Sequence, residues 1–137
     1  MLEITDPVFG RMCYEHRWIK KEDICIFGKN QTIKICAKAF NEKPITDSQR
    51  TSYLKMKKNL GNILNECVDK IYDYLNKFYN AKLEDVSKVN EHVQFTHIIF
   101  MQDGDTVLLF DTDYDIENGI GIQIYPEIEI GPQDAFL

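Results

Sequence analysis

The residues of this chain best suited to chemistry form one acidic run, Asp111-Thr-Asp113-Tyr114-Asp115-Ile-Glu117-Asn-Gly119. Alternating carboxylates occur in calcium-binding loops, where oxygen atoms coordinate the ion. The EF-hand loop also needs Gly at its sixth position and Glu at its twelfth. Here those positions hold Ile116 and Ile122, so the run is not an EF-hand. Three interpretations stay open: a looser calcium or magnesium site, a charged hairpin end that keeps strands unpaired, and a recognition patch for another protein.

Other residue types that could support catalysis are scattered. Cys13 and His16 are three residues apart, so on a strand they point to opposite faces and do not ligate one metal together. His97 is expected to share a strand face with Phe95 and Ile99, as a satisfied or edge histidine. The sequence has no phosphate-binding glycine motif and no spacing that marks a catalytic triad. We therefore predict no catalytic residues, no metal site, no cofactor and a protein that is not an enzyme.

The elements that must position the acidic run are strands. Residues 93–101, 106–110 and 120–125 are apolar runs separated by Asp103-Gly104 and Asn118-Gly119. Asp-Gly and Asn-Gly between apolar runs are strong hairpin signals. The C-terminal third is therefore predicted to form an antiparallel meander, with the acidic run at one hairpin end.

The central part of the chain has helical patterns. Thr46 begins a capping-box pattern, and a first helix is expected over residues 47–58. Gly61 weakens helical continuity, so a break or kink is expected near Asn59. Apolar residues then recur at helical spacing over residues 60–78, which predicts a second helix.

The strands of the N-terminal third are expected at residues 24–27 and 32–37, around a turn at Gly28-Lys29-Asn30. The order of strands, helices and strands predicts an α+β fold in one domain, residues 1–137. In this fold an antiparallel sheet, built from the N-terminal hairpin strands and the C-terminal meander, packs against a central helical pair.

The charges divide the chain into two parts. All 16 Lys and Arg residues lie within residues 1–88, whereas residues 89–137 hold 10 of the 22 Asp and Glu and no basic residue. Nucleic acid is therefore a poor partner for the acidic part, and a basic protein or a cation is a better one. No run of apolar residues is long enough for a membrane helix, and the N-terminal residues lack a signal-peptide pattern, so we expect a cytoplasmic protein.

Several segments taken together resemble a family of small bacterial proteins. They are Asp6-Pro-Val-Phe-Gly10, Trp18, Ile45-Thr-Asp-x-Gln49, the run from Leu109 through Gly121, and Ile130-Gly-Pro-Gln-Asp134. Such proteins are similar to the immunity proteins of polymorphic toxin and contact-dependent inhibition systems. The resemblance covers nearly the whole chain and implies a small acidic partner that binds and blocks a toxin domain, often a basic nuclease. It carries no catalytic residues.

Charge and resemblance together predict an inhibitor of a toxin domain. The partner-binding residues are expected to be the carboxylates Asp111, Asp113, Asp115 and Glu117, with Tyr114 as an aromatic anchor. The carboxylates would pair with the Lys and Arg residues that otherwise contact phosphate. The alternative is a cation-binding or general protein-interaction module that has no toxin partner.

Overall fold

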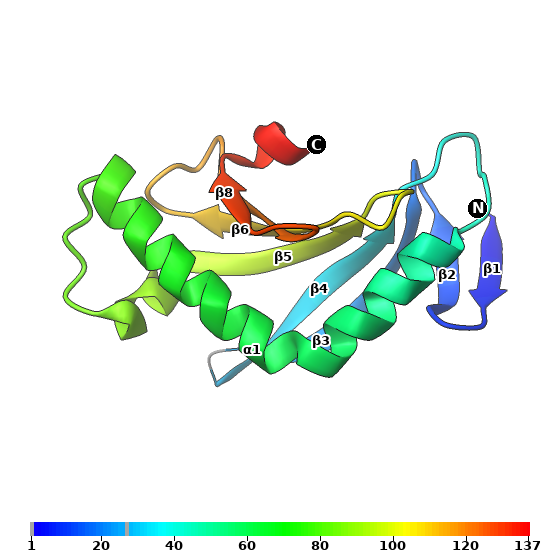
Figure 1. Cartoon of the computed structure of the whole chain (residues 1–137), viewed down its shortest axis with the longest axis horizontal. Coiled ribbons are helices and arrows are strands. Elements are labelled where there is room, and N and C mark those ends of the chain that lie inside the picture. Colours follow the sequence, from blue (N-terminus) through cyan, green and yellow to red (C-terminus); the bar gives the residue numbers. More distant parts are fainter. Residues whose placement is uncertain (1, 27) are drawn as a thin grey trace.

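One eight-stranded sheet, whose strands lie side by side in chain order, forms the framework of the structure. The computed structural model describes residues 2–26 and 28–137. The strands are β1 (Glu3–Asp6), β2 (Gly10–Tyr14), β3 (Trp18–Ile26), β4 (Lys29–Ala37), β5 (Val93–Phe100), β6 (Thr106–Thr112), β7 (Ile120–Tyr125) and β8 (Glu129–Gly131). The helices are α1 (Asp47–Phe78) and the short 3₁₀ helices η1 (Val86–Glu91) and η2 (Gln133–Phe136). Figure 1 shows α1 lying across one face of the sheet.

The pairing of β4 with β5 is parallel, and every other neighbouring pair is antiparallel. A parallel pair cannot be joined by a tight turn, so the chain must cross over the sheet, and α1 is that crossover. The predicted mixture of a largely antiparallel sheet and helical structure is confirmed in this coarse form. The sheet is larger than predicted, because β1 and β2 extend it and the parallel pair joins the N-terminal and C-terminal strands.

The predicted pair of central helices is wrong, because α1 is one continuous helix of 32 residues. Thr46 caps it as expected, and Gln49 completes the capping box. Glycine costs a helix about 1 kcal/mol relative to alanine. The buried side chains on either side of Gly61, Met56 and Leu64, pack into the same core and offset that cost. The helix therefore bends near its middle, as Figure 1 shows, and does not break.

Alternation along the strands supplies side chains to both faces of the sheet. Ile33, Ile35 and Ala37 of β4 lie in the main core beneath α1, as their spacing predicts. The opposite face carries a smaller buried cluster of Cys36, Ile99, Val107 and Leu109. Phe136 of η2 packs against this second cluster. The adjoining ends of β4, β5 and β6 are therefore buried on both faces, which explains the consecutive apolar residues there, such as Ile35-Cys-Ala37 and Ile98-Ile-Phe100.

A bulge in β5 overturns the predicted position of His97. The pairing register shifts between Phe95 and His97, so Phe95 points into the main core while Ile99 lies in the smaller cluster. His97 alternates with Ile98 and therefore shares the face of Ile99 and not that of Phe95. Desolvation and the nearby positive charge of Lys34 lower the pKa of His97. The imidazole is consequently neutral at neutral pH.

Gln49 ties the start of α1 to the two parallel strands. It is completely buried, and its Oε1 accepts a hydrogen bond from the Thr46 backbone N–H at 2.9 Å. Its Nε2 donates to the carbonyl of Lys38, which follows β4, at 2.9 Å, and to that of Phe100, the last residue of β5, at 3.0 Å. One side-chain amide thus satisfies backbone groups of the helix and of both strands.

Replacing Gln49→Met keeps the length of the side chain and removes all three hydrogen bonds. We expect the free energy of unfolding to fall by about 1–3 kcal/mol, because the Thr46 N–H and the Lys38 carbonyl lose this partner and the Phe100 carbonyl keeps only its bond from the Lys38 N–H. Urea unfolding measures the change. The matched control Asn62→Met, at an exposed position of the same helix, should change that free energy by less than about 0.5 kcal/mol. Equal effects of the two substitutions would contradict the role given to Gln49.

Candidate functional site

The acidic run is divided by the sheet into two parts. Asp111 lies near the end of β6, two residues after Leu109, and is therefore on the same face of the sheet as the smaller cluster. Its Oδ1 is 3.5 Å from Nε2 of Gln133. Residues 113–119, called the acidic loop below, connect β6 to β7. The loop therefore brings together Asp113, Tyr114 and the two acidic residues that follow, whereas Asp111 lies apart from them, on the face that η2 covers.

Asp115 holds the acidic loop together from within. Its Oδ2 accepts a hydrogen bond from the hydroxyl of Tyr79, the residue that caps the end of α1, at 2.7 Å. Its Oδ1 accepts from the backbone N–H and from the Nδ2 of Asn118, both at 3.2 Å. These bonds, above all the one from Tyr79, lower the pKa of the Asp115 carboxyl and raise that of the Tyr79 hydroxyl. Asp115 thus fixes the loop to the helix.

Asp113 and Tyr114 both contact His92, which precedes β5. The Nδ1 of His92 lies 3.0 Å from Oδ2 of Asp113, and the His92 and Tyr114 rings are 5.0 Å apart. Tyr114 is half-buried and also packs against the main core. Its predicted role as an aromatic anchor stays a prediction, and its packing gives it a second role, as support for the base of the loop.

The tip of the acidic loop is apolar. Ile116 has 85% of its surface exposed and lies next to the exposed Glu117. Sequence reasoning missed Ile116, because it treated the run only as a set of carboxylates. The signal was present as a single aliphatic residue inside an acidic turn, where no strand alternation calls for one.

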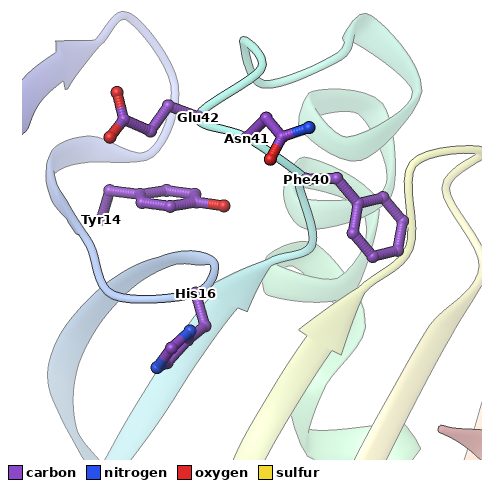
Figure 2. Close-up of a pocket in the computed structure, with 5 residues that line it drawn as sticks. All are labelled: Tyr14, His16, Phe40, Asn41 and Glu42. Atoms are coloured by element: carbon purple, nitrogen blue, oxygen red, sulfur yellow. The ribbon is translucent and has the colours of Figure 1, made fainter.

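A second candidate site is an open pocket of about 680 Å³, lined by Tyr14, His16, Phe40, Asn41 and Glu42. His16, Asn41 and Glu42 all have positive φ angles (68°, 52° and 60°), which residues other than glycine rarely adopt. The hydroxyl of Tyr14 donates to the carbonyl of Ala39 at 2.8 Å and holds this backbone in place. In Figure 2 the His16 imidazole and the Glu42 carboxylate lie on opposite sides of the Tyr14 ring, so they do not form an acid–base pair.

The described residues contain neither a cluster of metal-ligating side chains nor a helix that could cross a membrane. Among residues 2–26 and 28–137, no three or more His, Cys, Asp or Glu side chains gather closely enough to hold a metal ion. Over those residues, no helix has both the length and the hydropathy that a membrane crossing needs.

Comparison with known proteins places the chain in a family. The model of a domain of unknown function, DUF6985, matches residues 8–137. The chain belongs to this family. The matched region contains both the acidic loop and the pocket of Figure 2, so both candidate sites lie within the family's domain. Searches of curated proteins and of solved structures gave no significant match.

The lowered pKa of Asp115 makes a testable link between Tyr79 and the loop. Because this pKa is lower in the folded chain, its hydrogen bonds stabilise the fold at neutral pH, and that contribution is lost as pH falls through the lowered pKa. Tyr79→Phe removes the strongest cause, so we expect the pKa of Asp115 to rise toward the ordinary value of about 3.9. A carboxyl-carbon NMR titration measures it.

The control for this titration is Tyr72→Phe, because the Tyr72 hydroxyl donates to the carbonyl of Leu83 and not to the loop. This variant should leave the pKa of Asp115 unchanged. An Asp115 pKa that is the same in wild type and in Tyr79→Phe would show that the helix end does not hold the acidic loop.

Proposed function

We propose that this chain is a non-enzymatic, immunity-type protein of the bacterial cytoplasm that binds a cognate toxin domain and neutralises it. The observation that carries the proposal is the acidic loop, which is fixed by Asp115 and still exposes 85% of the Ile116 surface. An exposed aliphatic side chain on a hydrogen-bonded loop contributes nothing to this chain's own core. Together with the exposed carboxylates beside it, this side chain offers another protein both an apolar and a charged contact.

Charge supports a basic partner. Asp113 and Glu117 are exposed on either side of Ile116, and residues 89–137 contain no Lys or Arg that could neutralise them from the same part of the sequence. A concentrated negative field attracts a positively charged surface and speeds its association, by about 10- to 1000-fold at low salt. A nuclease domain carries such a surface, because it must bind phosphates.

The mechanism would be occlusion. Carboxylates of the acidic loop would pair with the Lys and Arg side chains that otherwise hold nucleic-acid phosphate, and Ile116 would fill an apolar recess beside them. Because the loop is already ordered by Asp115 and Tyr79, little conformational entropy is lost when it binds. Asp113 and Glu117 make the charged contacts in this proposal, while Asp115 and Tyr114 keep the loop in shape.

The same hydrogen bonds weigh against the cation-binding alternative. A calcium or magnesium ion at this loop would take carboxylate oxygens as ligands, and Asp115 lies at the centre of the loop's carboxylates. Both oxygens already accept hydrogen bonds, one from Tyr79 and the other from Asn118. An ion held by Asp115 would compete with Tyr79 and Asn118 for these oxygens, so we favour a protein partner.

The partner to test first is the C-terminal domain of a large secreted protein, if one is encoded immediately upstream of this chain's own gene. We expect Ile116→Ala, and separately Asp113→Asn with Glu117→Gln, to weaken binding of that domain by about tenfold or more, which is about 1.4 kcal/mol. The charge variant should also flatten the dependence of affinity on salt. Isothermal titration calorimetry at two ionic strengths measures both effects.

The matched control is Glu127→Gln with Glu129→Gln, which removes the same charge from exposed positions between β7 and β8 and at the start of β8. This control should bind the domain as wild type does. If the wild-type chain forms no complex with the upstream domain, the toxin partner is wrong. If it forms one that the loop variants do not weaken, the acidic loop is not the contact.

A further inference from the structure

The outer face of the first half of α1 carries an apolar residue within a cluster of lysines. Thr51, Leu54, Lys55 and Lys58 recur at helical spacing and therefore lie on one side of the helix, away from the core. Leu54 has 51% of its surface exposed. Together with Lys57 and Asn59, these residues line a shallow open hollow of about 630 Å³, called the lysine face below.

Two of the three lysines of this face, Lys55 and Lys57, are held in place by neighbouring side chains. The ammonium of Lys55 lies 4.2 Å from the centre of the Tyr125 ring. The ammonium of Lys57 lies 3.6 Å from a carboxylate oxygen of Glu22. Lys58 takes part in no ion pair of the described residues, so its charge is free to meet a partner. The face is thus an exposed aliphatic centre with a positive rim.

The acidic loop has the same arrangement as the lysine face, an exposed aliphatic residue among charged ones, but with the opposite charge. Ile116 is its exposed aliphatic centre, and the exposed Asp113 and Glu117 form a negative rim. Figure 1 shows the connection between β6 and β7 at the opposite side of the molecule from the first half of α1. The two surfaces of one molecule therefore do not meet each other, but each fits a second copy in both charge and polarity.

We propose that the lysine face docks the acidic loop of a second copy of this chain. Two such contacts, made reciprocally, close a dimer, whereas one contact repeated in the same direction extends a row of molecules. Lys58 and Lys55 meet Glu117 and Asp113 of the other copy, and Leu54 meets its Ile116. This association needs no other protein, so its test is independent of whether the chain binds a toxin domain.

The test is a charge exchange followed by sedimentation velocity of the full chain. One variant carries Lys55→Glu with Lys58→Glu, and the other carries Asp113→Lys with Glu117→Lys. At an ionic strength of ~20 mM, where charges act over about 20 Å, wild type should self-associate, and each variant alone should associate about tenfold or more weakly. An equimolar mixture should regain association, because each altered surface then meets its complement.

Controls separate this contact from net charge and from misfolding. Lys70→Glu with Lys77→Glu makes the same change in net charge on the second half of α1, at exposed positions, and should leave association unchanged. Recovery in the mixture also shows that both variants are folded. Leu54→Ser should weaken association without changing its dependence on salt.

Three results would overturn the proposal. One is a wild-type chain that stays monomeric at low ionic strength at every concentration. Another is a mixture of the two charge variants that associates no better than either variant alone. The last is a monomeric wild type whose lysine face binds a DNA oligonucleotide, with binding lost in Lys55→Glu with Lys58→Glu, because the face would then be a nucleic-acid surface.

Discussion

The parallel pairing of β4 with β5 is the constraint on which the rest of this structure depends. It obliges the chain to cross the sheet between the two strands, and α1 makes that crossing while it covers the main core. Gln49 fixes the start of the crossing to both strands, and the hydroxyl of Tyr79 fixes its end to the acidic loop. The helix therefore connects the architecture of the sheet to the shape of the candidate site.

The same pairing brings two oppositely charged parts of the sequence into one sheet. β4 carries Lys29 and Lys34 and no acidic residue, whereas β5 to β8 carry Asp111 and Glu129 and no Lys or Arg. The two parts meet where β4 pairs with β5. The result is a molecule with separated positive and negative surfaces, each with an exposed aliphatic residue, Leu54 or Ile116. Such a surface suits recognition by charge and contact, which is the basis of both proposals.

Local signals in the sequence predicted much of this fold. The turn at Asn118-Gly119, the alternation of Ile33 and Ile35, and the cap at Thr46 all depend on neighbouring residues, and the structure has them as expected. The parallel pair depends on contacts far apart in the chain, which no local pattern encodes. The unbroken helix through Gly61 and the bulge beside His97 were missed for a related reason, because packing overrides local preference there.

Amide hydrogen exchange of the chain alone and in complex with its protein partner tests most directly whether the acidic loop is the surface that meets that partner. Exchange in the complex is expected to slow at residues 113–119 and to stay unchanged around the pocket of Figure 2. Slower exchange around Tyr14 and Phe40, with unchanged exchange in the acidic loop, would contradict this expectation and move the contact to the opposite end of the sheet.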